Sequence, residues 1–128
     1  MTILLDNMIS HRIAAALDAL GEDVQALRDV FPQQTPDAQW IKEIGEKGWS
    51  FITVDKHIST RPHEVAALRD AQVTAFFLGR FWAKTKAWDQ AVWLIRHWPK
   101  FKNVVDTLAP GTCFTVQQNG RMRPISLS

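Results

Sequence analysis

The stretch Trp49-Ser50-Phe51-Ile52-Thr53-Val54, followed at once by Asp55, decides the fold of this 128-residue chain. It is almost wholly apolar, which is typical of a strand that is covered on both faces in a parallel sheet. A second apolar run, Ile3-Leu4-Leu5, ends at Asp6. Because ligands bind at the carboxyl ends of the strands in an open parallel sheet, we expect Asp6 and Asp55 to lie at a functional edge.

Helical patterns alternate with these strands. Apolar residues recur at helical spacing between Ile9 and Leu20, Thr35-Pro36-Asp37 opens a second helix with Thr35 as its cap, and Pro62 opens a third. Further strands are predicted at 23–27 and 73–78. The alternation predicts an α/β fold of three layers, α/β/α, with a mainly parallel central sheet and helices on both faces.

The C-terminal third predicts one broken helix and a hairpin. Apolar residues from Ala87 to Trp98 share a helical stripe, Pro99 is expected to break that helix, and a second short helix is expected near 104–108. Two strand-like runs then flank Asn119-Gly120, which is the strongest short signal for a β-hairpin.

Length and composition fit a single domain over residues 1–128, since 46% of the residues are apolar. No run approaches the roughly 18 apolar residues of a membrane span. The N-terminus lacks a basic segment before Asp6, so it predicts a first strand rather than a signal peptide, and we expect a cytoplasmic protein. The lone Cys113 excludes an intrachain disulfide and a thiolate zinc cluster, and it is predicted to be a small buried hydrophobe.

Charge is distributed unevenly along the chain, although the net charge is only +2. From Lys84 onward there are seven basic residues against two acidic ones, whereas the preceding part has eight against eleven. Carboxylates that hold a metal beside cations that hold phosphate would suit a nuclease.

Four acids are the candidate metal-site residues: Asp6 and Asp55 at strand ends, and Asp37 and Glu64 in the first turns of helices. Mg²⁺ prefers oxygen ligands, and two such ions can activate water against a phosphodiester. A structural role is the alternative for each, because Asp6 could cap the first helix, and acids in a first turn favour the helix dipole.

At these residues the chain resembles the PIN-domain superfamily, and within it the compact PIN-like group related to VapC toxins. The resemblance spans nearly the whole chain. It is carried by Leu4-Leu5-Asp6-Asn7, Leu20-Gly21-Glu22-Asp23-Val24, Thr35-Pro36-Asp37, Ile52-Thr53-Val54-Asp55-Lys56-His57-Ile58 and Arg61-Pro62-His63-Glu64.

The resemblance implies a Mg²⁺- or Mn²⁺-dependent ribonuclease that is the toxin of a type II toxin–antitoxin pair. It implies that Asp6, Asp37 and Asp55 bind the metal, that Glu64 assists as a fourth catalytic acid, and that the Thr53 hydroxyl lies beside the metal site. RNA and a cognate antitoxin are the implied partners, and a homodimer is expected.

Basic side chains after Asp55 are candidate phosphate ligands. Lys56 and Arg61 are predicted to bind substrate, as is Thr53 before Asp55, and Arg61 can give a bidentate contact. A solvated loop is the alternative.

The six Trp residues predict two environments. Trp40, Trp49, Trp88 and Trp98 fit buried stripes. Trp82 and Trp93 do not fit, and with Phe76, Phe77 and Phe81 they either form an apolar surface for an antitoxin helix or second subunit, or pack under the terminal hairpin.

Two rival functions remain at this point. A receiver-like signalling domain also carries acids at strand ends, but Asp6-Asn7 is not an acid pair, and no late strand ends in Lys. A PIN-like module without catalysis, serving as a partner-binding scaffold, is the second rival.

Overall fold

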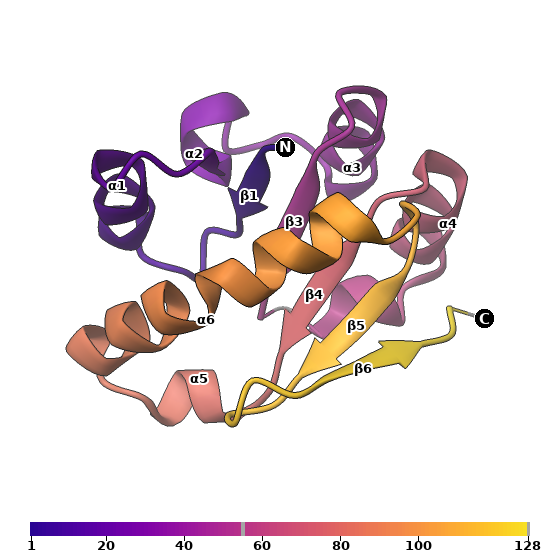
Figure 1. Ribbon diagram of the computed structural model, residues 1–128. Helices are drawn as coiled ribbons and strands as arrows, with labels where there is room; N and C mark the ends of the chain where they lie inside the picture. The colour runs from indigo at the N-terminus through magenta and orange to yellow at the C-terminus, as the bar shows by residue number, and fades with distance from the viewer. Residues whose placement is uncertain (55, 128) are drawn as a thin grey trace.

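The computed structural model of the protein describes residues 1–54 and 56–127, the side chains of Lys56 and His57 excepted. Its centre is a six-stranded sheet in the order β2-β1-β3-β4-β5-β6 (Figure 1). The strands are β1 (Ile3–Leu5), β2 (Val24–Ala26), β3 (Ser50–Thr53), β4 (Ala75–Leu78), β5 (Cys113–Val116) and β6 (Met122–Ile125). The helices are α1 (His11–Ala19), α2 (Leu27–Val30), α3 (Asp37–Glu46), α4 (Pro62–Ala71), α5 (Phe81–Lys84) and α6 (Ala87–Thr107), with a 3₁₀ turn η1 (Lys56–Ser59).

The first five strands are parallel, and only the β5–β6 pair is antiparallel. β1 lies between β2 and β3, with Leu5 opposite Ile52. The chain therefore moves outward from β1 in one direction to β2 and in the other to β3 and β4. The crevice at the carboxyl ends of two strands where the order reverses is the usual ligand site of such sheets, and here it lies between β1 and β3.

One face of the sheet is covered by α1, α5 and α6. Their buried residues pack on alternate strand residues such as Leu5, Ile52 and Phe76. Phe101 of α6 meets Phe76 edge-on, with ring centroids 4.8 Å apart. This helix layer joins the C-terminal third to the centre of the sheet.

The opposite face is covered by α2, α3 and α4, which pack on the intervening strand residues such as Leu4, Phe51 and Phe77. α3 and α4 approach closely because Gly45 has no side chain: a Cβ there would lie 2.6 Å from the Ala71 Cβ. The three-layer α/β/α architecture with a mainly parallel sheet and a C-terminal hairpin is thus confirmed.

Two local helix predictions were wrong. α6 continues through Pro99, where a break was predicted. Proline removes one backbone hydrogen bond and crowds the carbonyl of residue 95, but both positions are exposed, so water can hydrate that carbonyl while Trp98 and Phe101 anchor the helix to the sheet. α3 takes Pro36 rather than Thr35 as its N-cap.

The predicted Trp environments were wrong at Trp88, which is 81% exposed because it lies in the first turn of α6, before the residues that reach the sheet. Trp49 is only half-buried. Trp82 and Trp93 are buried, and the Trp93 Nε1 donates to the Gln118 carbonyl 2.7 Å away in the β5–β6 turn. Trp93 therefore packs under the hairpin, as one of the two interpretations had it, whereas Phe77 packs on the opposite face of the sheet.

The predicted hairpin and cysteine environment are confirmed. β5 and β6 flank a turn in which Gly120 has a φ of 85°. Cys113 is buried on the α3/α4 side, and burial raises the pKa of its thiol. Among residues 1–54 and 56–127, the structure contains no helix long and apolar enough to cross a membrane.

Candidate functional site

A hydrogen bond joins the carboxyl ends of the two central strands. Thr53, the last residue of β3, donates from Oγ1 to the Asp6 Oδ2 at 2.6 Å. Thr53 is fully buried, and Asp6, directly after β1, is half-buried. Because β1 and β3 are parallel neighbours, the two side chains point to the same face of the sheet, at the crevice where the strand order reverses.

Asp6 does not act as the cap of α1, which was its alternative role. The cap is Ser10, whose Oγ accepts from the backbone N–H of Arg12 at 3.2 Å. The carboxylate of Asp6 is instead held by an element 47 residues further along the chain. Capping of α1 does not require this hydrogen bond from Thr53.

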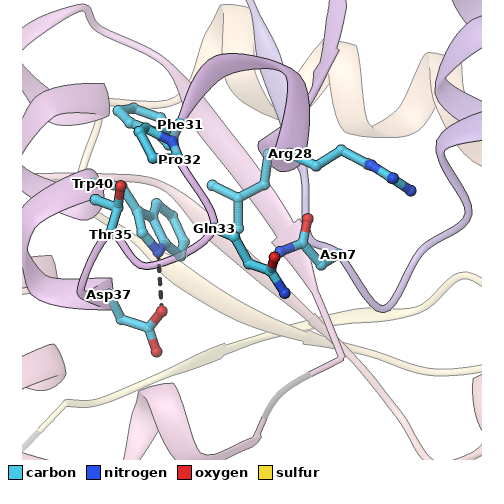
Figure 2. A pocket seen from close by; sticks show the side chains of 9 residues that line it. Asn7, Arg28, Phe31, Pro32, Gln33, Thr35, Asp37 and Trp40 are labelled. Carbon is cyan, nitrogen blue, oxygen red and sulfur yellow. Dashed lines mark hydrogen bonds between the residues drawn. The ribbon is translucent and has the colours of Figure 1, made fainter.

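Beside this point lies a pocket with a volume of about 460 Å³. Figure 2 shows the Asn7 and Gln33 side-chain amides on one side of the pocket and Asp37 on the other. Arg28 extends away from Asp37, and its guanidinium donates to the His11 Nδ1 at 3.0 Å. The carboxylate of Asp37 and the guanidinium of Arg28 thus lie at separate ends of the pocket.

Asp37 is the first residue of α3, and it is half-buried in the pocket wall. Its Oδ1 accepts a hydrogen bond from the Trp40 Nε1 at 3.0 Å, drawn as the dashed line in Figure 2. This bond fixes one carboxylate oxygen within the first helical turn. Asp37 therefore already has a structural role, which is compatible with binding through its other oxygen.

Glu64 lies in the first turn of α4, and its side chain is only 13% exposed. Its Oε1 is 3.6 Å from the Arg61 Nη1, and Arg61 is half exposed. The pair lies at the N-terminal end of α4, as the sequence predicted, but Arg61 must share its charge between Glu64 and any phosphate.

Two predicted site residues fall at the edge of what the structure describes. Asp55 lies outside the described residues, and for Lys56 only the backbone, in η1, is described. Within residues 1–54 and 56–127, no group of three or more His, Cys, Asp or Glu side chains is placed to hold a metal ion. The four-acid metal site, which includes Asp55, stays a prediction.

Arg28 and Gln33 are pocket residues that the sequence interpretation did not select. Arg28 follows the end of β2 by two positions. The rule that selected Asp6 and Asp55, that residues after parallel strands gather at one edge, could have found it. Gln33 lies in the loop between α2 and α3, and no pattern in the sequence marks it.

The comparisons with known proteins agree with this geometry. A family described as "PIN like domain" matches residues 1–80, which is more than half of the chain. The protein therefore belongs to the PIN-like domain family, and it has a nuclease-type fold. No curated protein and no solved structure matches the chain.

Proposed function

We propose that the protein is a Mg²⁺- or Mn²⁺-dependent endoribonuclease and the toxin of a type II toxin–antitoxin pair. The observation that carries the proposal is the Thr53–Asp6 hydrogen bond at the carboxyl ends of β1 and β3. It holds a half-buried carboxylate at the usual ligand position of the sheet, in a member of a family with a nuclease-type fold.

The proposed ion is a hard divalent cation. A carboxylate beside a hydroxyl offers the oxygen ligands that Mg²⁺ and Mn²⁺ take. Asp6, Asp37 and Asp55 would hold the metal, with Glu64 assisting. When bound, the metal supplies charge neutralisation and activation of water for phosphodiester hydrolysis.

The chain itself contributes positioning. Thr53 orients one oxygen of Asp6, and Trp40 orients one oxygen of Asp37. Arg61 and Lys56 would bind phosphates on either side of the scissile bond. Such pre-organisation lowers a barrier because the groups do not have to be ordered during the reaction.

The test compares wild type with Asp6→Asn on single-stranded RNA in Mg²⁺ or Mn²⁺. Asn keeps an oxygen that can accept from Thr53 but removes the charge. We expect hydrolysis to fall by at least about 100-fold, the usual cost of a lost electrostatic group. The matched control is Asp18→Asn, an exposed acid of α1 that contacts no part of the site, and it should be fully active.

Calorimetry with Mn²⁺ provides a readout that does not depend on turnover. Wild type and Asp18→Asn should bind the ion, whereas Asp6→Asn and Asp55→Asn should bind it weakly. Equal RNA hydrolysis and equal Mn²⁺ binding by wild type and Asp6→Asn would refute the proposal.

A partner-binding scaffold without catalysis is the second candidate. It is favoured by the bonds that already engage two of the acids, Asp37 with Trp40 and Glu64 with Arg61. Absence of Mn²⁺ binding by the wild type would select it. Membership of the PIN-like family favours both candidates over a receiver-like domain.

The antitoxin proposal needs an accessible surface. Trp82 and Trp93 of the predicted surface are buried. α6 instead exposes an apolar stripe at Trp88, Val92 and Ile95, which are four and three residues apart and so share one helix face. Growth arrest on induction should be relieved by co-expressing the antitoxin gene. The Trp88→Ser variant should still arrest growth, but the antitoxin should relieve that arrest less well. If the antitoxin relieves the arrest by Trp88→Ser fully, it does not bind this stripe.

A further inference from the structure

A second pocket, of about 540 Å³, lies at the same edge of the sheet but on its other half. It is formed where β4 and β5 end, between the η1–α4 connection and the β5–β6 turn. It shares no lining residue with the pocket of Asn7 and Asp37. In Figure 1 this is the end of the sheet where α5 and the hairpin turn lie.

The charge of this pocket is positive. Arg80, in the turn between β4 and α5, is its one charged lining residue among those the structure describes, and it is exposed. A guanidinium with an open fork binds phosphate in a bidentate manner. Among the residues that the structure describes, no acid lines the pocket to compete for it.

The remaining lining suits a flat, polar-edged ring. Phe77, Phe81 and Ile125 form an apolar wall, and the exposed Gln117 and Gln118 stand at the hairpin turn. Aromatic side chains stack on nucleobases of any type, and amides pair with the hydrogen-bonding edges of a base. The volume lies within the range of roughly 300–1,000 Å³ that is typical of small-molecule sites.

The walls are held in place by backbone bonds. The Gly79 N–H donates to the Val116 carbonyl at 3.0 Å, which ties the turn that bears Arg80 to β5. Trp93 anchors the hairpin turn through Gln118 and packs on Phe81, with ring centroids 5.0 Å apart. A pre-formed site loses less entropy on binding.

We propose that this second pocket binds one nucleotide of a single-stranded RNA, with its phosphate on Arg80 and its base against Phe81 and the two glutamines. The inference rests on the proposed function, because the pocket lies on the same edge of the sheet as Asp6. The RNA strand that is cleaved at Asp6 would therefore also reach the pocket. The inference adds a subsite, separate from the pocket of Asn7 and Asp37, that would hold the strand during cleavage.

The test uses the full-length protein with metal chelated, so that the acidic site cannot contribute. Nucleoside monophosphates, ribose 5-phosphate and inorganic phosphate are titrated up to about 10 mM and followed by NMR, because a single nucleotide is expected to bind in about the millimolar range. The nucleotides should bind at least about tenfold more tightly than ribose 5-phosphate, since only they carry the stacking base.

Two variants locate the binding. Arg80→Gln should weaken all three phosphate probes, and Phe81→Leu should remove the advantage of the nucleotides alone. The matched control, Lys42→Gln, loses one exposed positive charge on α3 outside this pocket, and it should bind like wild type. Equal binding of nucleotide and ribose 5-phosphate, or no spectral change at the highest concentration, would overturn the inference.

The inference and the proposed function can fail separately. Nucleotide binding that depends on Arg80, in a protein that hydrolyses no RNA, leaves the pocket standing and removes the ribonuclease. RNA hydrolysis that is unchanged in Arg80→Gln, together with absent nucleotide binding, removes the pocket and leaves the ribonuclease.

Discussion

Residues 1–80 and residues 81–127 build the same sheet in different ways. The first region matches the PIN-like family and carries every acid of the candidate site, together with β1 to β4 and the helices α1 to α4. The second region lies outside that match and supplies α5, α6 and the terminal hairpin, and its basic residues outnumber its acidic ones. The first region thus holds the acids of the proposed metal site, and the second completes the core.

The largest expected effect tests whether the second region is a true part of the core. Phe101→Ala removes a fully buried ring that packs edge-on against Phe76 of β4. We expect the free energy of unfolding to fall by about 3–5 kcal/mol, because a cavity replaces the ring. Urea denaturation measures the change.

The control for this variant is Val92→Ala on the exposed side of the same helix, which should cost about 0.5 kcal/mol or less. If Phe101→Ala costs no more than Val92→Ala, α6 is not an integral layer, and the two regions are more independent than the packing indicates.

The second prediction concerns the bond on which the proposed function depends. Thr53→Val keeps the shape of the side chain but removes the hydroxyl that donates to Asp6. A hydrogen bond to a charged group contributes about 1.5–3 kcal/mol, so the free energy of unfolding should fall by about that amount, and RNA hydrolysis should fall with it.

Thr74→Val is the matched control, because Thr74 is also a buried threonine but accepts only from the neutral Gly111 N–H, at 3.2 Å. Its cost should be about 1 kcal/mol, with hydrolysis unchanged. A loss of hydrolysis in Thr74→Val equal to that in Thr53→Val would mean that activity follows stability rather than the orientation of Asp6.

The third prediction lies within the first region. Gly45→Ala should destabilise the protein by about 1–3 kcal/mol through overpacking, because the new methyl group would lie 2.6 Å from the Ala71 Cβ and 2.8 Å from the Ala71 carbonyl oxygen. A thermodynamic cycle with Ala71→Gly measures the coupling. The double variant should recover part of the loss, and strict additivity would show that α3 and α4 can separate at little cost.

The strands β1, β3, β4 and β5 were predictable because each is a mainly apolar run. β6 was predictable from the Asn119-Gly120 turn that precedes it. The sequence places Asp6 and Thr53 at strand ends, but it does not establish that β1 and β3, which β2 separates along the chain, are neighbours in the sheet. Arg28 could have been selected by the rule that residues after parallel strands gather at one edge, because it follows the end of β2 by two positions.

What the sequence did not reveal depends on contacts between distant segments. Pro99 is a helix breaker in isolation, but α6 continues because Pro99 is exposed while Trp98 and Phe101 anchor the helix to the sheet. α5 has four residues and leaves too short a pattern to detect, although it determines that Trp82 is buried. The second pocket is lined by residues that lie between Ser59 and Ile125 in the chain, so no local sequence motif predicts it.

The smallest expected effect is an ion pair that links the two regions. Lys102 of α6 lies 2.8 Å from the Glu22 Oε1, which also accepts from the Trp98 Nε1 at 3.0 Å. The hydrogen bond from Lys102 lowers the pKa of Glu22 below its usual value of 4.5. A carboxyl group whose pKa is lowered in the folded state stabilises the protein above its unfolded pKa, and this stabilisation is lost as the pH falls through the folded pKa.

Glu22→Gln should therefore reduce the free energy of unfolding at neutral pH, and its difference from wild type should shrink as the pH falls below 4.5. Denaturation midpoints between neutral and acidic pH measure this. Glu46→Gln, which replaces an exposed acid at the end of α3, is the control for the loss of one carboxylate. A Glu22→Gln difference that stays constant with pH would show that Lys102 does not hold the carboxylate in solution. The link between the regions would then rest on the apolar packing of α6 alone.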